Sequence, residues 1–164
     1  MAQGSTSIVI RPAVAEDVPL IFEFIKELAE YEHLSSAVVA TEDLLRRTLF
    51  GSSPAAEIRI AFADSQPAGF ALFFTNYSTF VGRPGIYLED LFVRPAFRRM
   101  GIGRALLREV AAIAVSRQSG RLEWAVLDWN APAIAFYKTL GAKPMDEWTV
   151  MRVTGDALSE LAKP

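Results

Sequence analysis

The sequence predicts a mixed α/β fold, built from one sheet with helices on both of its faces. The first observation is that short runs rich in β-branched and aromatic residues alternate with longer runs whose apolar residues recur at helical spacing. The second is that proline and glycine separate these runs. The predicted strands span residues 8–11, 58–62, 68–77, 86–93, 122–127 and 148–153. The first predicted helix follows Asp17, and the others span residues 44–50, 104–116, 131–140 and 155–163. Such a mixture favours a mixed sheet that is covered on both sides.

The N-terminal third contains one strand and two helices. Residues 1–7 look like a flexible polar leader, and residues 8–164 are expected to form a single domain. Pro12 ends the first strand, because proline cannot donate to a sheet ladder. Asp17 can cap the next helix, and Thr41 and Gly51 open and close the second one. The apolar stripe of the first helix is Ile21, Phe22, Ile25, Leu28 and Ala29.

A hairpin follows these helices. Strands 58–62 and 68–77 are separated by a turn at residues 64–67, and the second strand is rich in phenylalanine. Gly82, Pro84 and Gly85 break the chain before the next strand. We therefore expect three consecutive strands in the middle of the sequence.

The central feature is a strand, a glycine loop and a helix in that order. Strand Ile86–Val93 is stopped by Pro95, and Gly101 and Gly103 then permit close backbone approaches. The following helix starts near Arg104. A loop of this kind directs free N–H groups and the positive end of a helix toward one point, which suits an anion such as a diphosphate. The arginines of the loop, which add positive charge there, are Arg98, Arg99 and Arg104.

The C-terminal third begins with a turn at Gly120 and the apolar run 122–127. Asn130 near the cap and Pro132 in the first turn start a helix at Ala131, and Gly141 ends it. A last strand, 148–153, and a short helical tail complete the chain.

Composition and charge exclude several classes of protein. The formal net charge of -2 and the lack of a long basic block argue against a nucleic-acid partner. The chain has no cysteine, which excludes disulfides, thiolate metal sites and a covalent intermediate on a cysteine sulfur. No apolar run reaches the length of a membrane span, so we expect no membrane association and take the cytoplasm as the default compartment.

Three kinds of anion-binding loop can be compared with the glycine loop. A Walker A loop requires Gly-x-x-x-x-Gly-Lys-Ser/Thr, which is absent. A dinucleotide fingerprint requires a third glycine where this chain has Leu106. The spacing of Arg98, Gly101 and Gly103 matches the pyrophosphate loop Arg-x-x-Gly-x-Gly of the GNAT N-acetyltransferases. A plain glycine-rich turn between a strand and a helix remains the alternative for the loop taken alone.

The chain resembles the GNAT family of N-acetyltransferases from Ile8 to about Val153, and within it the diamine (spermidine/spermine) and thialysine acetyltransferases. The segments that carry the resemblance are Ile10–Ala13, Ile25–Glu32, Tyr87–Val93 and Trp129–Lys138. The resemblance implies a largely antiparallel twisted sheet, splayed between its two central parallel strands. It also implies acetyl-CoA as cosubstrate, no metal, a small-molecule amine as acceptor and a homodimer.

The resemblance also implies two catalytic residues. An alkyl ammonium has a pKa of roughly 10.4, so it must lose a proton before it can attack the thioester. Glu89 is the candidate base, through water, and Tyr137 is the candidate acid that protonates the sulfur of coenzyme A. From the residues alone, Glu89 could instead be an exposed or ion-paired strand residue, and Tyr137 a helical core residue. Asp90 points to the opposite face of the strand from Glu89 by simple alternation.

The remaining site residues fall into two groups. The coenzyme contacts implied by the resemblance are Leu91, Phe92, Val93, Arg98, Arg99, Met100, Gly101, Ile102, Gly103, Arg104, Asn130, Pro132, Ala133 and Tyr137. The acceptor contacts are Tyr31, Glu32, Glu89 and Glu147. In the family the strand carries a bulge at Leu91–Val93 that frees backbone N–H groups. His33, the only histidine, is interpreted as a helix-end residue and not as a catalyst.

Two departures from the family bear on the acceptor. Phe80 stands where a tryptophan is expected, and the acidic stretch before the last strand is shortened to Lys143–Trp148. A shorter amine such as thialysine therefore fits as well as a polyamine. Two other functions stay open: a non-catalytic coenzyme A sensor, and an acetyltransferase of protein lysines or N-termini.

Overall fold

A computed structural model describes residues 6–164 of the chain. The chain divides into two compact units, one ending at Ala125 and the other spanning Val126–Pro164. Residues 1–5 of the predicted leader lie outside the described residues. Ser7 N–H donates a hydrogen bond to the Asp64 carboxylate, and the Ser7 carbonyl accepts one from Asp64 N–H. That both units form one domain stays a prediction.

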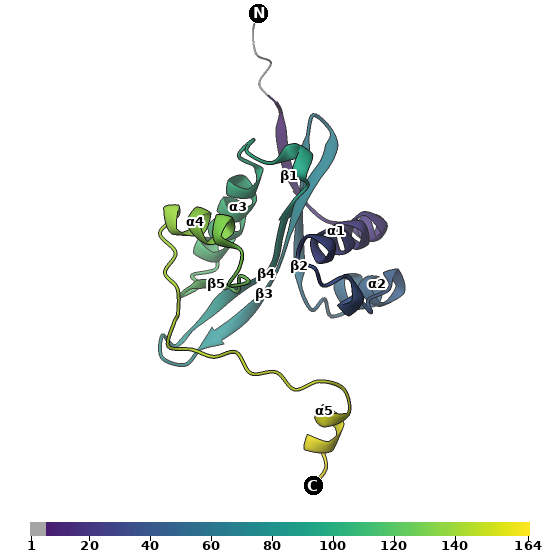
Figure 1. The fold of residues 1–164 in the computed structure, drawn as a ribbon, viewed down its shortest axis with the longest axis vertical. Coiled ribbons are helices and arrows are strands. Elements are labelled where there is room, and N and C mark those ends of the chain that lie inside the picture. The colour runs from purple at the N-terminus through teal and green to yellow at the C-terminus, as the bar shows by residue number, and fades with distance from the viewer. Residues whose placement is uncertain (1–5) are drawn as a thin grey trace, which may run out of the picture. The chain divides into compact units, whose positions relative to one another are not determined.

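The first unit contains a five-stranded sheet with the strands in sequential order (Figure 1). Its strands are β1 (Ile8–Pro12), β2 (Glu57–Ala63), β3 (Gln66–Ser78), β4 (Arg83–Val93) and β5 (Leu122–Trp124). The first four pair antiparallel, and only β4 and β5 run parallel. The predicted mixed and largely antiparallel sheet is therefore confirmed. Strand β5 ends at Trp124, three residues earlier than predicted.

Helices cover both faces of this sheet. Helices α1 (Val18–Tyr31) and α2 (Glu42–Phe50) lie on one face, and α3 (Ile102–Ser116) lies on the other (Figure 1). Three short 3-10 turns, at Ala15–Asp17, Ser35–Ala37 and Pro95–Phe97, join these elements. The helical spacing of apolar residues predicted each α-helix because one stripe of each must be buried against the sheet.

The two predicted N-caps behave differently. The Thr41 hydroxyl accepts a hydrogen bond from Leu44 N–H at 3.2 Å and caps α2 as expected. Asp17 precedes α1 but does not cap it through its side chain. Its carboxylate instead accepts from Val14 N–H at 2.8 Å and pairs with Arg11 at 2.7 Å. That ion pair holds the pKa of Asp17 below its ordinary value.

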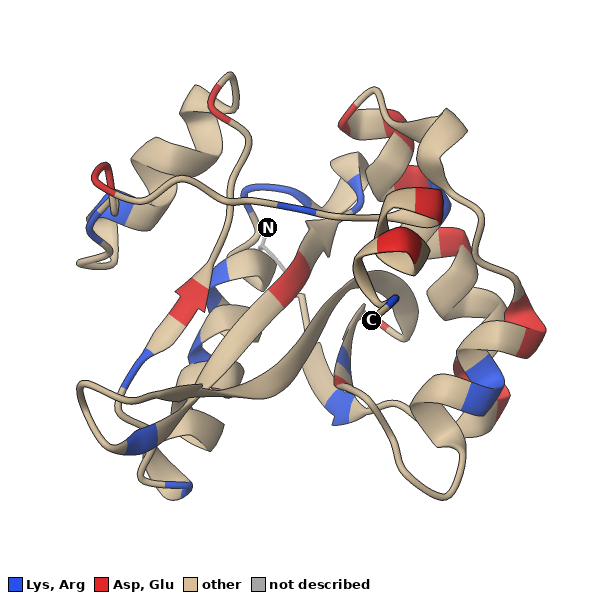
Figure 2. Cartoon of the chain, turned by 90° about the horizontal axis from the view of Figure 1, so that it is seen from below, with Lys and Arg blue, Asp and Glu red and all other residues tan. Residues whose placement is uncertain are grey.

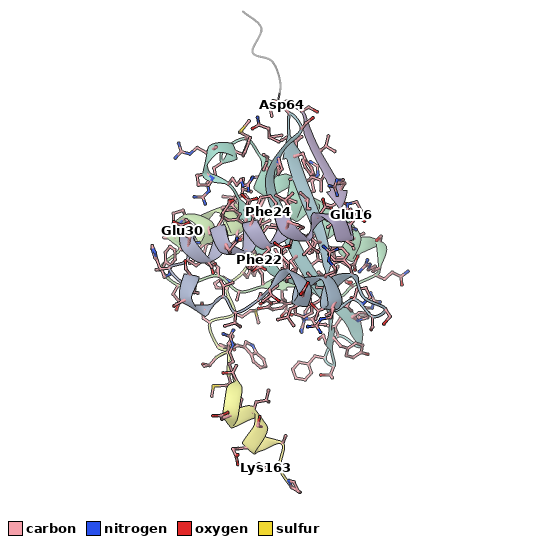
Figure 3. The ribbon with its side chains drawn as sticks, turned by 90° about the vertical axis from the view of Figure 1, so that its right-hand side faces the viewer. Glu16, Phe22, Phe24, Glu30, Asp64 and Lys163 are labelled. Atoms are coloured by element: carbon pink, nitrogen blue, oxygen red, sulfur yellow. The ribbon has the colours of Figure 1, made fainter. Side chains whose placement is uncertain are left out.

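The core beneath α1 and α2 is aromatic and aliphatic. Phe24 of α1 stacks on Phe70 of β3 with ring centroids 5.4 Å apart and meets Phe92 of β4 edge-on at 6.4 Å. Figure 3 looks onto this side of the molecule and labels Phe24 on α1. The buried members of this cluster are Ile21, Phe24, Leu49, Ile58, Ile60, Phe70, Leu72 and Phe92.

Arg94 ties α1 to the end of β4. Its guanidinium is paired with Glu27 at 2.7 Å and with Glu23 at 3.1 Å, and it lies 4.7 Å from the ring centroid of Phe24. It also donates to the Pro67 carbonyl at 3.1 Å. The central part of α1 is thus held at a fixed place on the sheet.

The second unit contains α4 (Ala131–Thr139) and α5 (Gly155–Leu161). The prediction of a strand at 148–153 is wrong, since this segment has no regular secondary structure. A strand requires a neighbour to satisfy its backbone groups, and no strand pairs with it among residues 6–164. Its apolar side chains are exposed, with Trp148 at 70% and Met151 at 85%.

Within residues 6–164, no helix is both long enough and apolar enough to cross a membrane.

Candidate active site

The glycine loop has the backbone geometry of an anion-binding turn. Arg99 and Gly101 adopt left-handed conformations, with φ of 64° and 83°, immediately before α3. The first helical hydrogen bond runs from Ala105 N–H to the Gly101 carbonyl at 2.9 Å. The N–H groups of Ile102 and Gly103 come before this bond, as the first N–H groups of a helix do. They belong to the positive end of the helix macrodipole.

The space above this loop is open. A Cβ atom built on Gly101 would meet no described atom within 4 Å, and one on Gly103 would meet only Val93 Cγ2 at 3.7 Å. The packing of the protein itself therefore does not require glycine at 103. A close approach by a ligand gives the physical reason for a residue without a side chain there.

The arginine side chains of the loop are exposed, and among them are Arg99 and Arg104. Arg98 is also exposed but makes two defined contacts. Its Nε donates to the Val93 carbonyl at 3.0 Å, and its Cζ lies 4.6 Å from the ring centroid of Tyr31. The loop thus contacts both the end of β4 and the end of α1.

Strand β4 contains a bulge at Glu89. Opposite it on β3, Leu72 pairs with Asp90 and the next residue, Phe73, pairs with Leu88, so Glu89 has no partner residue. The expected bulge is therefore present in this strand, but it precedes Leu91–Val93 instead of lying within that stretch.

The bulge changes the face to which Asp90 belongs. Asp90 pairs with Leu72, whose side chain lies in the core beneath α1. Simple alternation, which placed Asp90 on the opposite face from Glu89, is interrupted by the extra residue. That prediction is wrong, and Asp90 joins the α1 side of the sheet.

Asp90 lies under the influence of two other carboxylates at this place. Burial, together with the negative charges of Glu89 and Glu32, raises the pKa of Asp90 to about 7. Burial also raises the pKa of Glu32. Asp90 is partly buried, whereas Glu89 is exposed. Sequence reasoning missed Asp90, because only the bulge brings it to this side.

The C-terminal end of α1 is held by a Schellman motif. His33 adopts a left-handed φ of 60°, Leu34 N–H donates to the Ala29 carbonyl at 2.8 Å, and His33 N–H donates to the Glu30 carbonyl at 3.1 Å. The structural interpretation of His33 as a helix-end residue is confirmed. Tyr31 and Glu32, the predicted acceptor residues, are the last residue and the C-cap of α1, and the label of Glu30 marks this end of the helix in Figure 3.

Acidic residues are frequent on this side of the first unit. In Figure 2, where Asp and Glu are red, several of the red bands on the right-hand side belong to α1 and α2. On α1, Glu23 and Glu27 are paired with Arg94. The raised pKa of Asp90 comes from burial and from neighbouring negative charge.

Strand β4 has an open edge beyond the bulge. Strand β5 pairs with β4 only from Ile86 to Leu88. From Glu89 onward, the edge of β4 that faces away from β3 has no strand partner in the described part of the chain. Phe92 is buried in the core, while Leu91 and Val93 are half-buried. A ligand could use backbone groups along this edge, as the predicted coenzyme contacts require.

The second unit contains the remaining predicted site residues. The Asn130 side chain accepts from Ala133 N–H at 3.3 Å and caps α4, and Pro132 lies in the first turn. Tyr137 is a half-buried residue of α4 whose ring centroid lies 5.4 Å from that of Phe136. Glu147 is exposed in a turn. Each unit is described by itself, so the proximity of these residues to Glu89 stays a prediction.

Metal ligands are not gathered at this site or elsewhere in residues 6–164, where no group of three or more His, Asp or Glu residues could hold an ion.

Comparison with known proteins agrees with this geometry. Residues 21–142 match the model of the acetyltransferase (GNAT) family. The thialysine N-epsilon-acetyltransferase of Sus scrofa is 41% identical over 95% of this chain and 98% of its own length. The L-ornithine N5-acetyltransferase of Arabidopsis thaliana is 35% identical over 94% of this chain and 87% of its own. An integron cassette protein of V. cholerae has a similar structure, with a TM-score of 0.80, 29% identity, and coverage of 96% and 99% of the two chains. The chain is an acyltransferase that belongs to the acetyltransferase (GNAT) family.

Proposed function

We propose that this chain acetylates the primary amine of a small cationic acceptor, such as thialysine or ornithine, with acetyl-CoA as donor. The observation that carries the proposal is the cluster of Glu32, Glu89 and Asp90, in which burial and neighbouring negative charge raise the pKa of Asp90 to about 7. A cationic amine is the natural counter-ion for such a cluster, since an opposite charge nearby favours the ionised carboxylate. The two relatives described above are named for acceptors of this size, ornithine and thialysine.

The residues of the first unit fit a coenzyme. Acetyl-CoA supplies an acetyl group on a thioester sulfur. The loop Arg98–Arg104 offers arginine charge, the N–H groups that begin α3, and the open space above Gly101 and Gly103 for its phosphates. The open edge of β4 at Leu91–Val93 offers backbone groups to the pantetheine arm. In the second unit we propose contacts from Asn130, Pro132, Ala133 and Tyr137.

The proposed proton transfers use residues of both units. An alkyl ammonium with a pKa of roughly 10.4 must be deprotonated before attack. Glu89 takes this proton through water. Asp90 lies close enough to influence which of the two carboxylates holds the proton, because their negative charges repel each other. Tyr137 donates its phenolic proton to the departing sulfur. Tyr31, Glu32 and Glu147 complete the acceptor site.

Transfer of the acetyl group is proposed to be direct. The chain has no cysteine that could hold the group between two half-reactions. Direct transfer, in place of transfer through another nucleophile, requires that the enzyme bind both substrates before chemistry occurs. Initial-velocity lines should intersect, whereas parallel lines together with an isolable acetyl-enzyme would refute a ternary complex.

We also propose a homodimer that acts in the cytoplasm. The support for the dimer is the exposed apolar segment that includes Trp148 and Met151, together with Phe80, which is 94% exposed at the β3–β4 hairpin. Exposed apolar patches of this kind are typical of contact surfaces. Light scattering on the purified protein would measure the oligomeric state directly.

The decisive experiment is an assay of free-thiol release from acetyl-CoA against a panel of acceptors. The panel contains thialysine, ornithine, spermidine and a lysine-containing peptide. We expect the two amino acids to be acetylated fastest. Preference for the peptide would support a protein acetyltransferase, and binding of coenzyme A without turnover of any amine would support a sensor.

A further inference from the structure

Arg98 connects the glycine loop to the C-terminal end of α1. Its guanidinium lies over the ring of Tyr31, with Cζ 4.6 Å from the ring centroid, and its Nε donates to the Val93 carbonyl at 3.0 Å. Neither contact uses the two Nη groups. A guanidinium can stack on an aromatic ring and bind phosphate oxygens through its edge at the same time. Arg98 can therefore keep its contact with Tyr31 while it binds an anion on the loop.

Tyr31 is well placed to transmit this contact. It is the last residue of α1, and the Schellman motif around His33 fixes the turn that follows. Glu32, the next residue, contributes to the raised pKa of Asp90. A displacement of Tyr31 would therefore also move a carboxylate of the acceptor cluster.

The rest of α1 is held independently of the loop. Arg94 is paired with Glu23 and Glu27 in the middle of the helix and does not belong to Arg98–Arg104. Loss of the Arg98–Tyr31 contact should thus affect only the last turn of α1. Arg94 accordingly provides a matched control, because it is an arginine that holds the same helix at a different place.

We propose that Arg98 is a positioning residue that couples the binding of the two substrates. Phosphates on the loop fix its guanidinium, and the stacked guanidinium fixes Tyr31 and with it the acceptor end of α1. The inference rests on the proposed function, in which the loop binds coenzyme A and this end of α1 binds the amine. Because coupling is reciprocal, each ligand should tighten the binding of the other by the same factor. The factor should be roughly two- to fivefold, the range expected for an exposed cation–π contact.

The test measures coupling and not activity. Calorimetry gives the affinity of ornithine for the protein alone and for the protein saturated with coenzyme A, which carries no acetyl group and allows no turnover. The ratio of the two affinities is the coupling factor. Tyr31→Leu should bind both ligands, but its coupling factor should be near 1. Tyr31→Phe, which keeps the ring, should retain the wild-type coupling factor. Arg98→Lys keeps the charge but replaces the planar group by a point charge, which cannot cover the ring of Tyr31 and bind phosphate oxygens through a separate edge, so it should also give a factor near 1. The control Arg94→Lys should retain the wild-type factor.

The possible outcomes separate this inference from the proposed function. Wild-type protein that binds no coenzyme A would overturn both. If the wild-type protein bound both ligands with a coupling factor of 1, the coupling alone would be overturned. A factor that is unchanged in Tyr31→Leu and in Arg98→Lys would also overturn it. Since Arg98 is exposed, Arg98→Lys should fold even if Tyr31→Leu does not.

Discussion

Replacement of Asp90 by asparagine tests the geometry of the β4 bulge. Asparagine has nearly the same shape but cannot ionise. In the folded protein, burial and then the charges of Glu89 and Glu32 raise the pKa of Asp90 from 3.8 to about 7. At 1.36 kcal/mol for each pKa unit, ionisation of Asp90 in the folded state costs up to about 4 kcal/mol. Because the carboxylate is only partly buried, a measured value of about 2–4 kcal/mol is expected.

The pH dependence of this cost has a definite sign. A folded-state pKa above the unfolded value means that the native protein holds the proton more tightly, so the free energy of unfolding falls as pH rises from about 4 to about 7. Above pH 7 the cost is constant. Asp90→Asn removes the whole effect. It should therefore stabilise the protein by about 2–4 kcal/mol at pH 8 and by only about 1 kcal/mol at pH 4.5.

Urea unfolding at the two pH values, followed by fluorescence, measures these differences. The control is Glu30→Gln, an exposed carboxamide substitution on α1 that should change stability by less than about 0.5 kcal/mol at both pH values. Glu89→Gln should move the pH dependence of the wild-type protein to lower pH, because one of the charges acting on Asp90 is gone. An equal effect of Asp90→Asn at pH 4.5 and pH 8 would refute the placement of Asp90 beside the other carboxylates.

Four further predictions concern the loop, the proposed catalytic acid Tyr137 and two structural contacts. Gly103→Ala should fold at least as well as wild type, since its Cβ meets only Val93 at 3.7 Å, but calorimetry should show at least a tenfold weaker affinity for coenzyme A. Tyr137→Phe should keep coenzyme affinity and lower kcat by roughly 10²–10⁴-fold, as measured by thiol release; an unchanged kcat would remove the tyrosine from the mechanism. Arg94→Leu should lower the free energy of unfolding by about 2 kcal/mol, because Glu27 loses a partly buried partner, and Arg94→Lys should recover part of the loss. Thr41→Ala should cost about 1 kcal/mol in urea unfolding, and Thr41→Ser should cost almost nothing.

Local signals in the sequence determined most of the secondary structure. Hydrophobic spacing predicted α1, α2 and α3, and the glycines and Pro95 predicted where β4 ends and where the glycine loop lies. These signals succeed because they depend on backbone conformations and on periodicities within one element. The same local logic led to the interpretation of Thr41 as a cap and of His33 as a helix-end residue.

The sequence could not show features that depend on contacts between elements. Asp17 stands where a cap is expected, yet its carboxylate pairs with Arg11 from the preceding strand. The segment 148–153 has the composition of a strand, but composition does not supply a neighbouring edge, and in the described chain no strand pairs with it. A strand is completed only by its neighbour.

The candidate site shows the same division most clearly. The sequence by itself determined the position of the glycine loop, and it indicated Glu89 and Tyr31 through the family resemblance. Only the tertiary structure brought Asp90 to the same side as Glu32, because one extra residue in β4 reverses the alternation of side chains after Glu89. Only the tertiary structure placed Arg98 against Tyr31, which lies far from it in the sequence. Spacing along a chain determines which residues share an element, but the register between strands and the docking of a helix end decide which side chains meet.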